Sequence, residues 1–148
     1  VYASYKLHYN ATDDVDATLA TFCTAPNIRS LWHNCFCEVL GTFILVYGVL
    51  RMSDASFTLN DSTSEQEVLV GLGSIGAVRV GLIVFAIGLS LGGTTGYAIN
   101  PARDLGPRIA HAVLPIPGKR DSDWSYSWVP VIGPLIGAGS AALLYLAF

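Results

Sequence analysis

A short run near the middle of the sequence combines residues that can bind polar solutes, namely Asn100, Pro101 and Arg103. Asn is a favoured N-cap and Pro a favoured first helical residue, so we expect a helix to begin here. The start of a helix presents unpaired N–H groups and the positive end of its dipole. Asn100 adds its amide NH₂ as a donor, and Arg103, one turn on, adds a fixed positive charge with five donors. Such donors bind polar oxygen atoms and repel cations, which is the chemistry of a pore for neutral solutes.

The segment around these residues, 92–114, is not a simple membrane helix. It holds prolines and glycines together with the charged residues Arg103, Asp104 and Arg108. Irregular backbone and charge at membrane depth are tolerated only where they line a cavity or are buried in protein. We therefore expect the Gly- and Thr-rich residues 92–99 to be extended and to precede a short helix. The carbonyls expected to face a lumen are those of Gly96, Tyr97 and Ala98.

The composition places this segment in a membrane protein. Of the 148 residues, 52% are hydrophobic and 13% are charged, against about 25% charged in an average soluble domain. The mean hydropathy is +0.50. The uncharged runs 80–102 and 124–148 each exceed the roughly 20 residues that a helix needs to cross hydrocarbon. A soluble loop followed by a capped helix is therefore the weaker interpretation of the Asn-Pro segment.

The expected organisation follows from the positions of the charged residues. We predict the end of a preceding helix at residues 1–9, spans at 30–50, 68–91 and 124–148, and a re-entrant loop with a half-helix at 92–114. Polar connections are expected at 10–29, 52–67 and 115–123. One charge, Glu38, interrupts the first span.

Charge and cysteine content exclude several classes of protein. A net charge of −3 and a pI of about 5.4 argue against a nucleic-acid partner, and three cysteines argue against a disulfide-stapled domain. No cofactor or metal is expected, because the spacing His33-x-Cys35-x-Cys37 makes the side chains diverge on a helix. An enzyme is the least favoured class, since no nucleophile–base pair is evident. The chain begins with Val1 and shows no signal peptide, so we expect it to be a piece of a longer protein.

One glycine pattern resembles a nucleotide site but has the wrong surroundings. Residues 71–76 match the dinucleotide-binding spacing GxGxxG. Such a site needs an amphipathic helix next and an acidic residue about 20 positions further on. Residues 80–91 are apolar all round, and no acidic residue follows before Asp104. We interpret these glycines as small residues that pack between membrane helices.

Two further features are interpreted as structural. The spacing Gly133-x-x-x-Gly137 is expected to let helices approach closely, inside the bundle or between subunits. Arg79 lies in an apolar stretch near the end of a predicted span. We expect its side chain to snorkel to the interface and to have no role in a pore.

The run Gly-Tyr-Ala-Ile-Asn-Pro-Ala-Arg-Asp at residues 96–104, followed by Leu-Gly-Pro-Arg at 105–108, closely resembles the second signature loop of the major intrinsic proteins. More narrowly, it resembles the aquaglyceroporin, or glycerol facilitator, branch, and the resemblance continues at 38–43 and 128–138. It implies an all-α membrane protein: the second inverted repeat of an aquaporin-like fold, with three transmembrane helices and one re-entrant half-helix. It also implies a missing N-terminal half as partner, a homotetramer, and a multi-pass place in the plasma membrane of a bacterial cell.

Three residues match positions of the family's selectivity filter, namely Gly88, Tyr97 and Arg103. Water-selective members carry His where this chain has Gly88, and a glycine removes a bulky donor and widens the constriction. Tyr97 falls where glycerol facilitators place an aromatic ring, an apolar wall for the CH edge of a polyol, while Arg103 offers donors to its hydroxyls. The pore signature consists of Asn100, Pro101 and Ala102. The resemblance thus implies a passive channel for glycerol, other small neutral polyols and water that excludes ions and protons.

Two carboxylates, Glu38 and Asp104, are expected to brace the loops of the pore. In the family, the counterpart of Glu38 accepts hydrogen bonds from the backbone of the re-entrant loop, and such bonds offset the cost of burying a charge in a membrane. The alternative is that Glu38 lies at the membrane interface, stabilised by a helix N-terminus. Asp104, directly after Arg103, fits the glycerol-type pattern.

Three other functions are compatible with the sequence. The chain could belong to a water-selective aquaporin, or be a non-conducting truncated half-channel that needs a partner half. A secondary transporter with broken helices is the third, and saturable, ion-coupled uptake would distinguish it. The family topology places 10–29 and 115–123 outside the cell and 51–67 inside. The basic residues do not support this orientation, since more of them fall in the outer loops.

Overall fold

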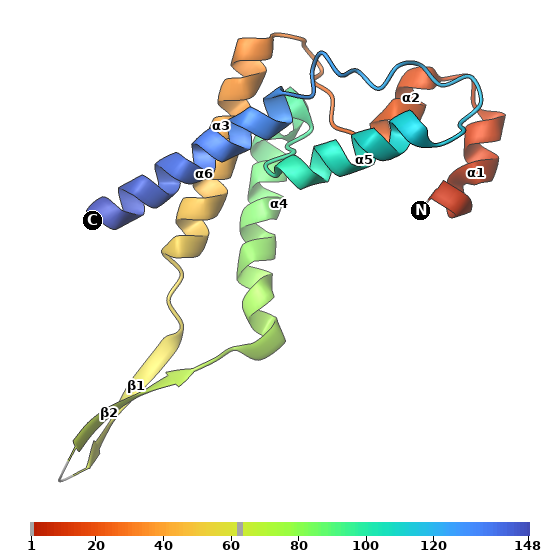
Figure 1. Ribbon diagram of the computed structural model, residues 1–148. Coiled ribbons are helices and arrows are strands. Elements are labelled where there is room, and N and C mark those ends of the chain that lie inside the picture. Colours follow the sequence, from red (N-terminus) through yellow and green to blue (C-terminus); the bar gives the residue numbers. More distant parts are fainter. Residues whose placement is uncertain (1, 62–63) are drawn as a thin grey trace.

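The computed structural model describes residues 2–61 and 64–148 (Figure 1). Its helices are α1 (Tyr2–Ala11), α2 (Val15–Ala20), α3 (Leu31–Leu50), α4 (Gly76–Thr95), α5 (Pro101–Val113) and α6 (Val129–Ala147). Two strands, β1 (Ala55–Asp61) and β2 (Ser64–Val70), and a 3₁₀ turn at Gly73–Ile75 lie between α3 and α4. In Figure 1, α3 and α4 lie side by side, α6 crosses α3 obliquely, and α5 runs from the end of α4 toward α1 and α2.

Three helical segments are long and apolar enough to cross a membrane: Leu31–Leu50, Gly73–Thr95 and Val129–Ala147. The first and third lie within the predicted spans 30–50 and 124–148. The helix α5 is shorter and follows Asn100, as the cap-and-proline pattern predicts. The chain therefore supplies three long apolar helices and one short helix that begins between them.

The start of α4 differs from the predicted span at 68–91. Residues 68–70 belong to β2, and the helix begins only at Gly76, after the 3₁₀ turn. A short Val-Leu-Val run is compatible with either a strand or a helix, so periodicity alone does not distinguish them. Gly71 and Gly73, the latter with φ +56°, separate this run from the helix.

The end of α4 also differs from the expectation that residues 92–99 are extended. The helix continues to Thr95, so residues 92–95 are helical. Gly96 ends the helix in the left-handed conformation, with φ +75°, and its N–H donates to the carbonyl of Gly92 at 2.9 Å. A residue without a Cβ adopts this conformation at low cost, which is why glycine so often ends a helix.

The connection expected to be a loop at 52–67 consists of residues 52–54 and most of a β-hairpin whose second strand continues to Val70. Strands β1 and β2 pair antiparallel, with Ala55 opposite Val70 and Phe57 opposite Val68. β-Branched and aromatic residues favour strands, and several occur here among polar ones. The polar and acidic composition of this connection gave no sign of the strand pairing.

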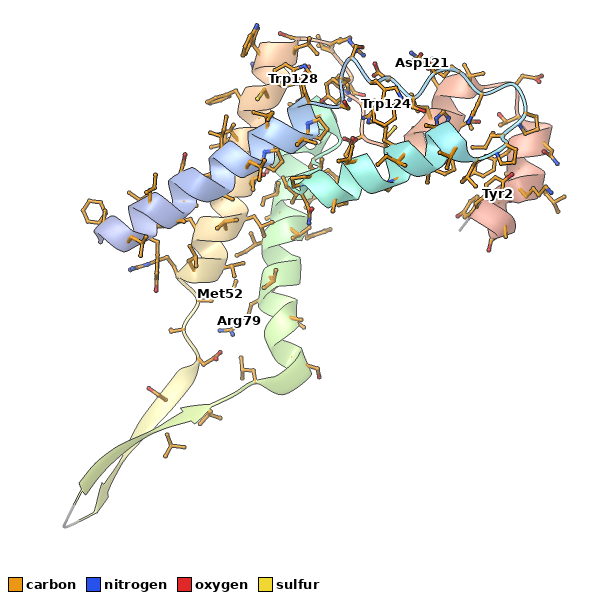
Figure 2. The ribbon with its side chains drawn as sticks, in the orientation of Figure 1. Tyr2, Met52, Arg79, Asp121, Trp124 and Trp128 are labelled. Carbon is orange, nitrogen blue, oxygen red and sulfur yellow. The ribbon has the colours of Figure 1, made fainter. Side chains whose placement is uncertain are left out.

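Arg79 ties the start of α4 to the chain that leaves α3 (Figure 2). Its guanidinium donates to the carbonyl of Ser53 at 2.9 Å and to the Asp54 carboxylate at 2.7 Å. The side chain therefore turns toward the polar connection. This placement agrees with a snorkelling arginine rather than one that points into the bundle.

Helix α6 packs against α3 through two glycines. A Cβ on Gly133 would lie 2.6 Å from the Cβ of Glu38, and a Cβ on Gly137 would overlap the carbonyl oxygen of Val39. The Gly-x-x-x-Gly spacing thus allows close approach of two helices within this chain. Beside this contact, Cys35, Tyr126 and Val129 form a buried apolar cluster.

Helix α4 is much less enclosed than α3 or α6. Of its residues, Ile87 and Thr95 are buried, whereas Leu82, Phe85 and Leu89 are exposed. Apolar side chains of this size on one face need lipid or further protein to cover them. Its other face contacts α3, where a Cβ on Gly48 would lie 2.8 Å from the side chain of Ile83.

The close contact of α6 with α3 predicts that adding one methyl group at this contact lowers the stability of the protein. Gly137→Ala places a Cβ against the backbone of α3, so we expect it to lower the free energy of unfolding by about 1–3 kcal/mol, as overpacked cores do. Thermal unfolding of the detergent-solubilised full-length protein measures this loss. Gly139→Ala is the matched control, since a Cβ there meets nothing within 4 Å. Equal melting temperatures for the two variants would contradict the packing described here.

Candidate pore-lining site

The segment between α4 and α5 has an unusual backbone. Gly96, Tyr97 and Ile99 all have positive φ, at 75°, 39° and 43°. The conformation is uncommon for residues with a side chain and especially for a β-branched one, and each such residue costs of order 1–3 kcal/mol. Strain of this kind persists only where the surroundings fix the backbone. The contacts of this segment should therefore include strong interactions.

Glu38 of α3 supplies the strongest of these contacts. Its two carboxylate oxygens accept hydrogen bonds from the backbone N–H groups of Ala98 and Ile99, at 3.0 and 2.7 Å. Glu38 is 1% exposed, and α6 passes directly over its Cβ at Gly133. The carboxylate lies inside the bundle, as the bracing interpretation predicts, and not at the membrane interface.

These hydrogen bonds set the direction of the neighbouring carbonyls. In a trans peptide the C=O points opposite to the N–H of the same unit. The carbonyl of Tyr97 therefore points away from Glu38, and that of Gly96 points away from Thr95, whose hydroxyl accepts from the N–H of Tyr97 at 3.1 Å. Gly96 and Tyr97 have partly exposed surface. Ala98 is buried in this chain. Its carbonyl lies opposite the N–H of Ile99, which donates to Glu38, so this carbonyl also points away from Glu38. That the three carbonyls line a lumen stays a prediction.

Asn100 begins α5 as its N-cap. Its side-chain oxygen accepts from the N–H of Ala102 at 2.9 Å, with Pro101 at the first helical position. Because the oxygen is used in the cap, the amide NH₂ is left to donate outward from the helix start. Asn100 and Ala102 are exposed and Pro101 is partly exposed, so this end of the half-helix is open on one side.

The ring of Tyr97 lies flat against a glycine surface of α4. A Cβ on Gly88 would lie 3.2 Å from the ring carbon Cζ, and a Cβ on Gly92 would lie 3.0 Å from Cδ1. The guanidinium of Arg103 lies over the ring, 4.9 Å from its centroid. The structure therefore brings the three predicted filter residues together. It adds Gly92, which sequence reasoning missed although its i, i+4 spacing from Gly88 places both on one helix face.

Asp104 lies behind this surface and is fully buried. Its carboxylate accepts from the guanidinium of Arg108 at 2.8 and 2.9 Å and from Thr24 in the loop before α3. The predicted brace therefore exists as a set of contacts. Its partners are α5 itself and the 21–30 loop rather than the re-entrant backbone. Thr24 was not identified from the sequence, because nothing local connects it with a residue in α5.

The loops at this end of the bundle are tied to each other. Arg29 donates to both carboxylate oxygens of Asp123 at 2.8 Å, and Ser125 adds a third hydrogen bond. Burial alone would raise the pKa of Asp123, but the hydrogen bonds from Arg29 and Ser125 outweigh it and hold the pKa below its ordinary value. Arg120 pairs with Asp16 in α2. These contacts join the 10–30 and 115–128 regions.

A cavity of about 660 Å³ opens above the site. It is lined by residues 22–27 of the loop, by Gly96 and Arg103, and by residues of α2 and its start that include Asp14 and Asp16. Polar backbone on one side and a guanidinium on the other make it a suitable approach for a hydrogen-bonding solute. The cavity therefore extends from α2 and the 21–30 loop to Gly96 and Arg103.

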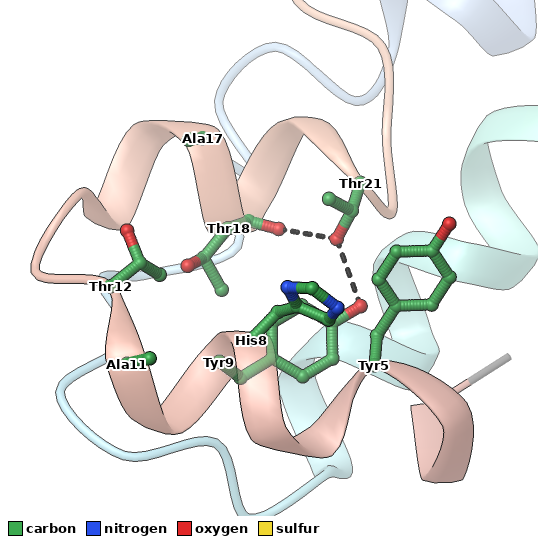
Figure 3. A pocket seen from close by; sticks show the side chains of 8 residues that line it. All are labelled: Tyr5, His8, Tyr9, Ala11, Thr12, Ala17, Thr18 and Thr21. Carbon is green, nitrogen blue, oxygen red and sulfur yellow. Dashed lines mark hydrogen bonds between the residues drawn. The ribbon is translucent and has the colours of Figure 1, made fainter.

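A second cavity, of about 390 Å³, lies between α1 and α2 (Figure 3). The hydroxyl groups of Tyr9 and Thr21 are paired with each other at 3.1 Å, and that of Thr21 also donates to the carbonyl of Thr18. These two hydroxyls thus already have partners within the protein. We regard it as packing space between two short helices.

The described side chains hold no group of metal ligands. Cys35 and Cys37 are buried in α3 while His33 is exposed, so the three do not converge. The glycines at 71–76 follow an antiparallel hairpin and lead into the apolar α4. This is not the parallel strand–helix unit that a dinucleotide site requires.

Comparisons with known proteins identify the family of this chain. The sequence pattern of the family "Major intrinsic protein" matches residues 2–145. The chain is 53% identical over 145 residues to the "Probable glycerol uptake facilitator protein" of Thermotoga maritima, covering 98% of this chain and 56% of that protein. It is 48% identical over 147 residues to the "Glycerol uptake facilitator protein" of Bacillus subtilis, covering 99% and 48%.

The fold is similar to the X-ray structure of the aquaglyceroporin from Plasmodium falciparum. The TM-score is 0.68 at 30% sequence identity, over 98% of this chain and 55% of that one. The chain belongs to the major intrinsic protein family, and it spans about half the length of the relatives it matches. The predicted family, its aquaglyceroporin branch and the all-α membrane fold class are confirmed.

The hydrogen bonds of Glu38 predict how a variant behaves. Glu38→Gln replaces one acceptor oxygen with an NH₂ group that faces a backbone N–H. We expect it to lower the free energy of unfolding by about 2–3 kcal/mol, the scale for losing a hydrogen bond to a charged group and leaving a buried donor unpaired. The midpoint of thermal unfolding in detergent reports this change.

Asp54→Asn is the matched control for Glu38→Gln, since it also neutralises one carboxylate. Asp54 and its partner Arg79 are both partly exposed, and such pairs contribute about 0–1 kcal/mol. If Glu38→Gln were no more destabilising than Asp54→Asn, the bracing role of Glu38 would be wrong.

Proposed function

We propose that the whole protein is a passive transmembrane channel for glycerol, other small neutral polyols and water, and that it excludes ions and protons. The observation that carries this proposal is the Tyr97 ring seated on Gly88 and Gly92 beside the Arg103 guanidinium. A polyol has an apolar CH edge and a row of hydroxyls. The ring suits the first and the guanidinium suits the second.

The proposed passage uses donors and acceptors from both sides of the re-entrant segment. The carbonyls of Gly96 and Tyr97 accept hydrogen bonds from the solute, while Arg103 and the NH₂ of Asn100 donate to it. Each replaces a hydrogen bond that the solute gives up when it leaves water. A cation gains no such replacement near Arg103, and the positive end of the α5 dipole adds to the repulsion. Neutral solutes therefore pass and cations do not.

The proposed channel needs further walls beyond those in this chain. The exposed ends of Asn100 and Arg103 and the uncovered face of α4 at Leu82 and Phe85 support this view. We propose that an N-terminal half supplies the opposite wall and that the complete protein forms a homotetramer in the plasma membrane. The bacterial origin of the two facilitators compared above supports a bacterial source.

The proposal is tested with the full-length protein in liposomes. Liposomes that contain it should swell in glycerol several times faster than empty ones, at a rate linear in glycerol concentration and unaffected by ion gradients. Swelling equal to that of empty liposomes would overturn the channel proposal. Saturable, ion-coupled uptake would favour a transporter, and water flux without glycerol flux would favour a water-selective aquaporin.

The contact of the Tyr97 ring with Gly88 and Gly92 predicts that small substitutions at these glycines change glycerol permeability more than water permeability. Gly92→Ala and Gly88→Ala each bring a methyl group within about 3.2 Å of ring atoms, so the ring must move away from α4 and toward the solute. We expect glycerol permeability to fall several-fold and water permeability to fall less. Stopped-flow light scattering of the liposomes measures both.

Gly81→Ala is the matched control on the same helix, because a Cβ there meets nothing within 4 Å. It should leave both permeabilities unchanged. If Gly92→Ala matched this control, the ring of Tyr97 would not form a wall of the passage.

A further inference from the structure

In the 21–30 loop, Thr24 is bound to α5 through all of its polar groups, and the ring of the nearby Phe22 packs edge-on against that of His111 in α5. The backbone N–H and the hydroxyl of Thr24 both donate to one oxygen of Asp104, at 2.8 and 2.7 Å. Its carbonyl accepts from the guanidinium of Arg108 at 3.1 Å. All three polar groups of Thr24 are thus bound to one carboxylate–guanidinium pair. These residues lie about 80 positions apart in the sequence.

The pair that holds Thr24 is itself fixed on every side. Asp104 and Arg108 are both fully buried and are joined by two hydrogen bonds. The remaining donors of Arg108 bind the carbonyls of Ser122 and Asp123 at 2.7 and 2.9 Å. All five N–H groups of the guanidinium are therefore used. Because an unpaired buried charge is strongly destabilising, the pair provides a rigid attachment for the loop.

The attached loop lies directly on the re-entrant segment. A Cβ on Gly96 would lie 3.2 Å from the Cβ of Thr24 and 3.6 Å from the backbone nitrogen of Ala25. Residues 22–27 line the same cavity as Gly96 and Arg103. The loop thus forms the side of that cavity next to the two residues that, in the proposed function, meet the solute.

We propose that the Asp104–Arg108 pair positions the Thr24 loop as a wall of the constriction, and that this wall limits the size of the polyol that passes. The inference rests on the proposed function. Asp104 and Arg108 act here as positioning residues, because they hold the loop and do not touch the solute. When the loop is released, the space beside Arg103 widens and larger polyols pass more easily.

Cys23, the neighbour of Thr24, reports the position of the loop. It is buried and unpaired with any other cysteine. Burial raises the pKa of its thiol to about 11, so little thiolate exists at neutral pH and the held loop should react slowly with maleimide. Release of the loop exposes the thiol to water and speeds the reaction. The readout does not depend on transport.

The test compares Thr24→Val with Thr21→Val in the full-length protein. Val keeps the methyl contact with Gly96 and loses the hydroxyl that binds Asp104, while Thr21 binds Tyr9 and Thr18 instead. Two quantities are measured: the rate of maleimide labelling at Cys23, and the ratio of glycerol to xylitol permeability in liposomes. Cys23→Ser gives the background from other cysteines.

For Thr24→Val we expect labelling to rise about tenfold, as the loss of a hydrogen bond to a charged group predicts. The glycerol-to-xylitol ratio should fall several-fold. Thr21→Val should match the unsubstituted protein in both measurements. Thr24→Ser, which keeps the hydroxyl, should restore the slow labelling and the original ratio.

Two results would overturn the inference while leaving the proposed function intact. One is faster labelling with an unchanged permeability ratio, which would make the loop structural only. The other is unchanged labelling, which would mean that the position of the loop does not depend on the hydrogen bond from the Thr24 hydroxyl to Asp104. Absence of glycerol flux through the unsubstituted protein is a different failure, which overturns the proposed function and this inference together.

Discussion

Two backbone N–H groups in the re-entrant segment, those of Ala98 and Ile99, would lie unpaired inside a membrane if Glu38 were absent. An unpaired amide in an apolar environment costs several kcal/mol, and a buried carboxylate without partners costs more. Each therefore compensates the other, at 3.0 and 2.7 Å. These two hydrogen bonds stabilise a strained, non-helical segment between α4 and α5. The position of Tyr97 depends on them.

The rest of the site follows from that constraint through packing. The glycines of α6 let that helix lie over α3 and enclose Glu38, and the glycines of α4 receive the Tyr97 ring. With the backbone of 96–99 fixed, Asn100 caps α5 and Arg103 meets the ring one turn later. Small residues thus determine where the polar groups lie, although they take part in no hydrogen bond through a side chain. Behind this surface, Asp104 and Arg108 bind Thr24 of the 21–30 loop, as Glu38 binds the backbone of Ala98 and Ile99.

Local sequence patterns predicted those features that depend on interactions between residues close together in the chain. The Asn-Pro cap of α5 and the apolar spans at α3 and α6 depend on residue type and near neighbours, whereas the bracing role of Glu38 was implied by the family resemblance. The sequence did not predict where α4 starts or that a hairpin precedes it, because a three-residue apolar run fits a strand or a helix equally well. The contact of Thr24 with Asp104 joins residues about 80 positions apart, and the seat of Tyr97 on Gly92 depends on a turn whose φ values no propensity predicts. Such contacts require the three-dimensional fold.

Hydrogen–deuterium exchange at the amides of Ala98 and Ile99 in the full-length protein tests the central claim most directly. If Glu38 holds the re-entrant segment, these two amides should exchange only through rare opening, far more slowly than an unprotected backbone amide. Glu38→Gln should then speed their exchange without speeding that of the helix α6. Rapid exchange of both amides in the unsubstituted protein, at the rate of an unprotected backbone, would contradict the account.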